Sequence, residues 1–187
     1  MDFSNHEVIG EILDYCVRRN IPAVIGTTGY TEEEIALIHD ASKKIPVFHS
    51  GNMSVGIALL RKLAKQAASM FPDADIEIVE KHHHRKLDAP SGTALLIAES
   101  IAEVRENAVF VEGRSGLGKR TPEEIGIHAI RIGNEVGTHE VLLSNGNETI
   151  TLKHEAENRA LFAQGALKAA SFMEGKEPGY YNMDNLV

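Results

Sequence analysis

Cysteine is almost absent from this sequence of 187 residues, which contains only Cys16. A single cysteine excludes an intramolecular disulfide and any zinc site that needs several thiolates. Long apolar runs are also absent, because no segment approaches the roughly 20 apolar residues that span a bilayer. The first residues, MDFSNHEVIG, carry neither the basic nor the apolar region of a signal peptide. These absences predict a cytoplasmic protein with no membrane partner.

Positive charge is the second scarce feature. The chain has 19 Lys and Arg residues against 27 Asp and Glu residues, which gives a formal net charge of −8. Proteins that bind nucleic acid usually present a basic surface, and the only short basic run lies at Lys81–Lys86. We therefore expect no nucleic-acid partner. A small basic cluster on an acidic chain instead favours a small anionic ligand.

Helical and strand patterns alternate over the first 50 residues. Apolar residues recur at helical spacing over 9–17 and 35–41, and the segments 21–26 and 44–49 are typical of short buried strands. Alternation of this kind predicts a doubly wound parallel sheet with right-handed crossovers. In such a sheet the ligand lies at the carboxyl ends of the strands.

Two segments have the spacing of a capping box, in which a hydroxyl and a carboxylate three residues apart satisfy the first free N–H groups of a helix. They are Ser4 with Glu7 and Thr31 with Glu34. Each precedes one of the apolar repeats, so helices are predicted to begin there.

A mixed α+β unit with antiparallel strands is predicted after a boundary near residues 52–54. Helices are predicted at 54–71, 93–104 and 158–173, and strands at 73–82, 125–133, 138–144 and 148–154. Asn145-Gly146 joins the last two strands, and Asn-Gly between strands is a strong hairpin signal. The tail, 177–187, is expected to be a loop that packs back on the first unit.

Two polar loops follow the first two predicted strands. They are GTTG, Gly26–Gly29, and SGNM, Ser50–Met53. Glycine lets a backbone approach a ligand closely, and Thr, Ser and Asn offer short hydrogen-bonding side chains. These loops are therefore candidates for ligand binding. The alternative is that both are ordinary turns.

The segment EKHHHRKLDAPSGTA, residues 80–94, concentrates ionisable side chains. A metal site is one interpretation of three consecutive histidines. However, neighbouring residues of a strand point to opposite faces, so His82 and His83 diverge. The cations Lys81, Arg85 and Lys86 also oppose the binding of a metal ion. These considerations disfavour a metal site, and we assign no metal ligand.

Proton transfer is the second interpretation of this segment. Histidine donates or accepts a proton near neutral pH, and lysine attracts carboxylates. Pro90 ends the preceding segment, and Ser91-Gly92-Thr93 open a helix whose first N–H groups can bind an anion. The combination suits acid-assisted chemistry on a small carboxylate-bearing substrate. The remaining alternative is a solvated basic turn followed by an ordinary N-cap.

The same segment resembles the signature of the 4-hydroxy-tetrahydrodipicolinate reductase family, formerly called dihydrodipicolinate reductase. The segments VIGTTGYT, GNMSVGI, RIGNEVGTHEV and HEAENRALFAQGALKAASFM resemble that family in the same order, so the resemblance spans essentially the whole chain. It implies the reduction of a cyclic dicarboxylate with NADH or NADPH on the diaminopimelate–lysine pathway. It also implies that the chain has three parts. Residues 1–53 belong to a Rossmann dinucleotide-binding domain, residues 54–175 form a substrate-binding domain that builds a homotetramer, and residues 176–187 form a tail.

Residue roles follow from the resemblance, motif by motif. The implied catalytic residues are His82, a proton donor and acceptor, and Lys86, a proton donor. The implied substrate-binding residues are His83, Gly92 and Thr93. The implied cofactor-binding residues are Gly26, Thr27, Thr28, Ser50, Gly51, Asn52 and Met53, the last standing where the family usually has Phe. Arg159 and Phe162 are expected to close over the cofactor.

The family begins with a strand and a Gly-rich turn of the G-x-x-G-x-M-G type, followed by residues that recognise the adenosine ribose. None of these is present here, so we expect this polypeptide alone to bind NADH weakly or not at all. Two functions stay open: the NAD(P)H-dependent reductase, and a cofactor-deficient dicarboxylate-binding or assembly module of the same family. The choice between NADH and NADPH also stays open. An assay of NADH oxidation separates the two functions.

Overall fold

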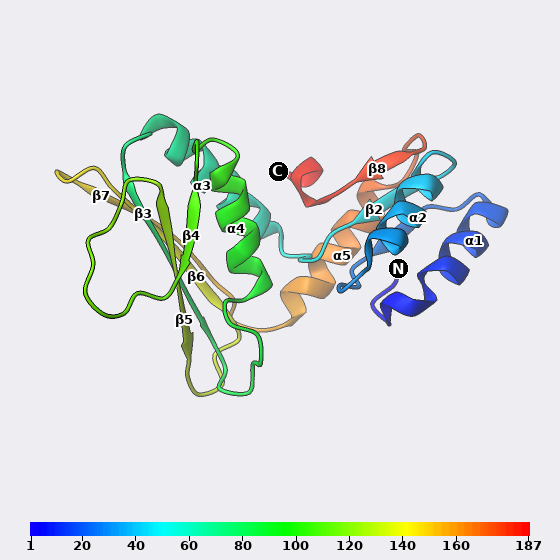
Figure 1. Ribbon diagram of the computed structural model, residues 1–187. Helices are drawn as coiled ribbons and strands as arrows, with labels where there is room; N and C mark the ends of the chain where they lie inside the picture. Colours follow the sequence, from blue (N-terminus) through cyan, green and yellow to red (C-terminus); the bar gives the residue numbers. More distant parts are fainter. The chain divides into compact units, whose positions relative to one another are not determined.

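The computed structural model describes residues 1–187, which form two compact units (Figure 1). Unit 1 consists of Met1–Val55 with Ala160–Val187, and unit 2 consists of Gly56–Arg159. Unit 1 contains a parallel sheet, and unit 2 contains a mixed sheet. The predicted fold class, a parallel α/β sheet and an α+β unit, is therefore confirmed. No helix combines the length and the apolar composition of a membrane span.

Unit 1 is built on a three-stranded sheet in the order β1-β2-β8, with every pair parallel. On the other side of β1, Asp2 forms an isolated parallel bridge with Ile25. Ile9, Ile38 and Val47 lie almost fully buried in the core of this unit. The elements are η1 (His6–Val8), α1 (Ile9–Arg19), β1 (Ala23–Ile25), α2 (Glu32–Ser42), β2 (Pro46–His49), α5 (Ala160–Phe172), β8 (Gly179–Tyr181) and η2 (Met183–Leu186).

The tail does not remain a loop, so that prediction was wrong. Its strand β8 pairs in parallel with β2, with Tyr181 opposite Phe48. The Tyr181 ring also meets Phe172 of α5 edge-on, with ring centroids 5.8 Å apart. A strand of three residues is too short to show alternation in the sequence. Pairing with β2 and the ring contacts therefore define it, rather than a local pattern.

One of the two predicted capping boxes is confirmed and the other is wrong. Thr31 and Glu34 form a reciprocal capping box at the start of α2. The hydroxyl and N–H of Ser4 instead donate to the carboxylate of Asp2, at 2.5 and 3.1 Å. Asp2 is buried, so its carboxylate needs these donors more than an exposed helix end does. Asn5 takes the capping position before η1, and α1 follows.

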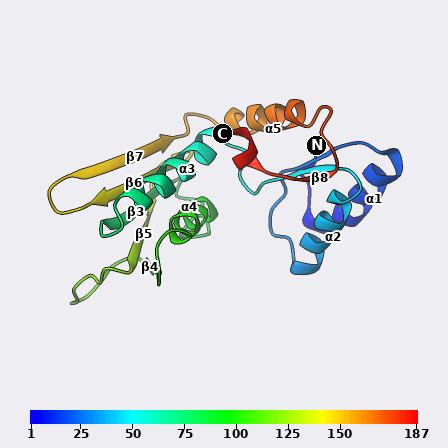
Figure 2. The ribbon, with the colours of Figure 1, turned by 90° about the horizontal axis from the view of Figure 1, so that it is seen from above.

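Unit 2 is a five-stranded sheet in the order β4-β5-β3-β6-β7. The pairs β4–β5 and β5–β3 are parallel, whereas β3–β6 and β6–β7 are antiparallel. The predicted hairpin joins β6 to β7 and extends from the sheet (Figure 2). The elements are α3 (Val55–Met70, its first residue in unit 1), β3 (Asp75–His82), α4 (Gly92–Ala102), β4 (Val109–Glu112), β5 (Glu124–Arg131), β6 (Thr138–Ser144) and β7 (Thr149–Glu155).

The core of unit 2 lies between this sheet and the helices α3 and α4, which cover the same face (Figure 1). Ile76 and Ile78 of β3 are fully buried there, together with Ile97 of α4. Alternation along a strand sends every second side chain to this face. It therefore also directs Glu80 and His82 toward the helix side of the sheet.

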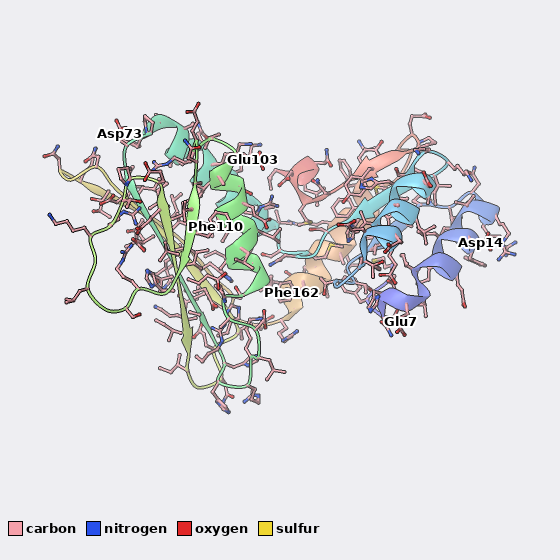
Figure 3. The ribbon with its side chains drawn as sticks, in the orientation of Figure 1. Glu7, Asp14, Asp73, Glu103, Phe110 and Phe162 are labelled. Carbon is pink, nitrogen blue, oxygen red and sulfur yellow. The ribbon has the colours of Figure 1, made fainter.

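The edge strand β4 was not predicted. It is four residues long, and three of them are exposed, so it lacks a clear alternation of buried and exposed positions. Phe110 lies on this strand, and Glu103 ends α4 before it (Figure 3). Only the parallel pairing of β4 with β5 identifies this segment as a strand.

Candidate active site

The carboxyl end of β3 meets the amino end of α4 at a group of polar side chains. The backbone N–H of Ser91, which caps α4, donates to Oε1 of Glu80 at 3.0 Å. Glu80 and His82 continue the face that Ile76 and Ile78 present to the core. The fold thus places two ionisable side chains at the edge of an apolar core, directly at a helix N-terminus.

Glu80 is fully buried, and both of its carboxylate oxygens are hydrogen-bonded. Oε1 accepts from Ser91 N–H and from Arg131 Nη2 at 2.7 Å, while Oε2 accepts from Arg131 Nη1 at 2.9 Å. His82 Nδ1 lies 2.5 Å from Oε2. Burial alone raises the pKa of Glu80, but the hydrogen bonds from His82, Arg131 and Ser91 outweigh it and lower that pKa to about 2. Glu80 is therefore a carboxylate at neutral pH.

The ring of His82 is fixed by contacts on several sides, and its side chain is only 12% exposed. The ring of His139 meets it edge-on, with centroids 5.2 Å apart. A Cβ atom added to Gly137 would lie 3.0 Å from Nε2 of His82. Because Gly137 has no side chain, the space beside Nε2 stays open.

His139 of β6 is buried, and its Nε2 lies 3.2 Å from the hydroxyl of Ser91. Its Nδ1 has no hydrogen-bond partner. The pKa of His139 is lowered to about 3, chiefly by burial, and the electrostatic effect of the neighbouring His82 acts in the same direction. His139 is therefore a neutral, structural neighbour of His82 at neutral pH.

Lys86 lies in the turn between β3 and α4, and its Nζ is 2.8 Å from Oδ1 of Asp88. The hydrogen bond from Lys86 lowers the pKa of Asp88, and the backbone N–H of Gly92 lowers it further. A carboxylate thus pairs with an ammonium group close to the start of α4. A Cβ atom added to Gly92 would meet nothing within 4 Å, so the helix end is sterically open.

His83 and Thr93 complete the predicted residues of this segment. His83 is half-buried, and its Nδ1 has no hydrogen-bond partner. Burial lowers the pKa of His83, and the charges of Arg85 and His82 act in the same direction. Thr93 is the second residue of α4 and is half-buried.

The first predicted cofactor loop follows β1 in unit 1. Gly26, Thr27 and Thr28 line a cavity of about 250 Å³, together with residues 3–6. The Thr27 hydroxyl donates to Asp2 at 2.7 Å, which fixes its side chain. A Cβ atom added to Gly26 would overlap the ring of Phe3. A larger residue at position 26 would therefore displace the ring of Phe3, which is 54% exposed.

The second predicted cofactor loop, Ser50–Met53, follows β2 and does not line that cavity. The hydroxyl of Ser50 donates to the carbonyl of Asn52 at 2.9 Å, and Met53 is buried. A Cβ atom added to Gly51 would lie 3.5 Å from Cγ2 of Thr28, so the two loops are neighbours. Both therefore lie at the carboxyl ends of parallel strands, where this type of sheet binds ligands.

Three polar residues of the site were not assigned a role from the sequence: Glu80, Arg131 and His139. Glu80 stands two residues before His82 on a predicted strand, so a shared face could have been inferred. Arg131 and His139 come from β5 and β6, and only the register of those strands with β3 brings them close. Among residues 1–187, no group of three His, Cys, Asp or Glu side chains is arranged to hold a metal ion.

A parallel α/β unit with polar loops at its strand ends, joined to an α+β unit with an ionisable site, is the architecture of a protein with a Rossmann-type part. Comparison with protein families makes this specific. Residues 1–53 match the family described as dihydrodipicolinate reductase, N-terminus, and residues 56–187 match dihydrodipicolinate reductase, C-terminus. The chain therefore belongs to the dihydrodipicolinate reductase family, as its motifs predicted, and this membership implies a nicotinamide cofactor.

Individual relatives agree with this assignment. The chain is 51% identical to the 4-hydroxy-tetrahydrodipicolinate reductase of Caldanaerobacter subterraneus subsp. tengcongensis, over all of this chain and 75% of that protein. It is 50% identical to the enzyme of the same name from Clostridium tetani, over all of this chain and 74% of that protein. A solved structure, dipicolinate-bound dihydrodipicolinate reductase from Paenisporosarcina sp. TG-14, is 31% identical. Its TM-score is 0.82, over all of this chain and 72% of that one.

Proposed function

We propose that the protein reduces 4-hydroxy-tetrahydrodipicolinate to tetrahydrodipicolinate in lysine and diaminopimelate biosynthesis, with NADH or NADPH as the reductant. Relatives about half identical to this chain carry the name of this activity. The Paenisporosarcina relative binds dipicolinate, a cyclic dicarboxylate. The substrate proposed here belongs to the same chemical class.

The observation that carries the proposal is the position of the Asp88 carboxylate. It pairs with the Lys86 ammonium at 2.8 Å, and the backbone N–H of Gly92 at the start of α4 contributes to the lowering of its pKa. This arrangement binds a carboxylate with one charged donor and one helix N-terminus. A carboxylate of the substrate can take the same place, because Asp88 is largely exposed and Gly92 leaves the helix end open.

Two residues of this segment are the proposed proton donors. A bound nicotinamide cofactor would supply a hydride to an electron-poor carbon of the ring, after the substrate has lost its hydroxyl and a ring hydrogen as water. His82 or Lys86 donates the proton that balances this addition, while His83, Gly92 and Thr93 hold the carboxylates and orient the ring. Orientation of this kind contributes a large part of the rate enhancement.

In unit 1, Gly26, Thr27 and Thr28 would hold the nicotinamide portion of the cofactor, and Ser50, Gly51, Asn52 and Met53 would form a second contact. The cavity beside Gly26 and the closeness of Gly51 to Thr28 support this assignment. We further propose that residues 1–53 are part of the dinucleotide-binding domain, that 54–175 contain the substrate-binding domain, and that 176–187 are a tail on the first. Residues 160–175 of this division belong to unit 1 in the structure.

A homotetramer is also proposed, built through the α+β domain. The sheet face that the helices leave uncovered carries exposed apolar side chains, among them Val109 and Ile130. Light scattering of the purified protein distinguishes a tetramer from a monomer directly.

Two measurements on the same protein sample test the proposed reaction. The first follows the oxidation of NADH and of NADPH with freshly generated substrate. The second measures the binding of dipicolinate by calorimetry. Oxidation that depends on the substrate supports the reductase. Binding of dipicolinate without any oxidation of either cofactor contradicts it and is the result expected of a dicarboxylate-binding module.

A further inference from the structure

The carboxylate of Glu80 has only donors around it. Ser91 contributes a backbone N–H, and Arg131 contributes two N–H groups to the two oxygens. The fourth neighbour is Nδ1 of His82, at 2.5 Å. Since Glu80 is fully buried, these four contacts account for its interactions, and water does not replace them.

These contacts determine which nitrogen of His82 carries a proton in the neutral ring. An ionised carboxylate only accepts hydrogen bonds, so Nδ1 must be the donor in its contact with Glu80. The low pKa of Glu80, about 2, agrees with ionisation throughout the neutral range. The neutral ring is thus the Nδ1–H tautomer, and Nε2 holds the free electron pair.

Nε2 is also the nitrogen with open space beside it. Gly137 lies on that side, where a single Cβ atom would come within 3.0 Å of Nε2. On another side the ring is supported by His139, which the Ser91 hydroxyl contacts at 3.2 Å. Nδ1 is held by Glu80, so Nε2 is the nitrogen left to exchange a proton with a bound molecule.

We infer that Glu80 is a positioning residue for His82, which holds the ring in the Nδ1–H tautomer and presents Nε2 to the substrate. Arg131 and the Ser91 N–H hold Glu80 in turn, so the orientation of His82 is set by β5 and α4 as well as by β3. The inference rests on the proposed function, because it assigns Nε2 as the atom that exchanges the proton in that reaction.

The substitution Glu80→Gln gives a sharp test, because the amide has one oxygen and one NH₂ group. If NH₂ replaced Oε1, it would face two fixed donors, Ser91 N–H and Arg131 Nη2. If NH₂ replaces Oε2, it faces only one fixed donor, Arg131 Nη1, and His82 can adapt by moving its proton to Nε2. We therefore expect Glu80→Gln to convert His82 to the Nε2–H tautomer.

The chain offers a matched control on the same strand. Glu77 also pairs with an arginine and a histidine, since Arg120 Nη1 lies 2.5 Å and His128 Nε2 lies 2.7 Å from its oxygens. Its odd position places it on the opposite face of β3, away from His82. Glu77→Gln thus removes a similar carboxylate without touching the site.

The experiment combines a turnover assay with the ¹⁵N spectrum of the histidine rings, recorded at a pH at which the ring of His82 is neutral. We expect kcat to fall roughly 100-fold or more in Glu80→Gln, as for loss of a general acid. The affinity of this variant for dipicolinate should change by no more than about threefold. The control Glu77→Gln should have a kcat near that of the wild type. The spectrum should show Nδ1–H in the wild type and Nε2–H in Glu80→Gln.

The outcomes separate this inference from the proposed function. If the wild-type protein binds dipicolinate but oxidises no NAD(P)H, both the proposed reductase function and the positioning role of Glu80 in that reaction are contradicted. If the wild-type protein turns over normally but His82 is the Nε2–H tautomer, only the positioning role of Glu80 is contradicted. This measurement uses the wild-type protein alone, so it does not depend on the folding of a variant. An equal kcat in Glu80→Gln and in the wild type also contradicts the positioning role of Glu80.

Discussion

Gly165 of α5 packs against the main-chain carbonyl of Met53 so closely that a Cβ atom at position 165 would overlap the carbonyl oxygen. The loop Ser50–Met53 is therefore held in place by backbone rather than by an adaptable side chain. We expect Gly165→Ala to displace this loop and to lower the free energy of unfolding by about 1–3 kcal/mol, the usual cost of overpacking. Denaturation in urea measures the change.

Gly10 of α1 is the matched control for this prediction, because it is also a helical glycine. A Cβ atom there would lie 3.9 Å from Cδ1 of Leu37, an ordinary contact. Gly10→Ala should leave stability unchanged or raise it by up to about 1 kcal/mol, since alanine favours helix. Equal stability of the two variants would show that the contact between Gly165 and Met53 is not tight.

Ser91 has two roles that a single substitution removes together. Its hydroxyl accepts from Ala94 N–H as the N-cap of α4 and also contacts His139 Nε2. Ser91→Ala should cost about 1–2 kcal/mol of unfolding free energy, as for other N-cap serines. Ser69→Ala is the control, because Ser69 is exposed and bonds only the Gln66 carbonyl. A Ser91→Ala protein as stable as this control would contradict the capping role.

His139 makes the folded state sensitive to acid. Its pKa is about 3 in the folded protein, against 6.5 for an ordinary histidine. As the pH falls below 6.5 the unfolded chain takes up a proton that the folded chain does not, so the free energy of unfolding decreases until the pH reaches about 3. Stability from this group is therefore complete above pH 6.5 and lost toward acid pH.

The variant His139→Gln isolates this effect, because glutamine keeps a polar group but does not titrate. Its stability should depend less on pH between about 6.5 and 5, where the wild type loses about 2 kcal/mol through this histidine. The low pKa of Glu80 affects stability only at lower pH, below its ordinary value of 4.5. Identical pH dependence in urea denaturation of both proteins would contradict the assignment of this pKa.

The local half of the candidate site could be predicted from the sequence. Residues 80–94 are contiguous, and the strand and helix patterns on either side place His82 at a strand end and Ser91-Gly92 at a helix start. Thr31 with Glu34 was predicted for the same reason, since a capping box is complete within four residues.

The other half depends on pairing between distant segments. Arg131 stands opposite His82 in the register of β3 with β5, and His139 stands opposite Glu80 in the register of β3 with β6. One sequence does not reveal register, because a shift of one residue reverses every side chain. The short strands β4 and β8 were missed for a related reason, since pairing defines them.

Proton donation by His82 or Lys86 is the step of the proposed reaction that would depend on this chain's own ionisable side chains. Their side chains are 12% and 21% exposed, so both are partly accessible near the junction of β3 and α4. The exposed neighbour His84, which contacts only the Gly133 carbonyl through its side chain, provides the control. His84→Ala should reduce the rate by less than about threefold, since it removes no general acid.

The most direct measurement is substrate-dependent oxidation of NAD(P)H by the double variant His82→Ala with Lys86→Ala, compared with the wild type and with His84→Ala. Cofactor affinity is measured on the same samples. We expect kcat to fall by about 10²- to 10⁴-fold, with cofactor affinity nearly unchanged. Near-wild-type turnover in a folded double variant would contradict it, because the proton would then come from another group.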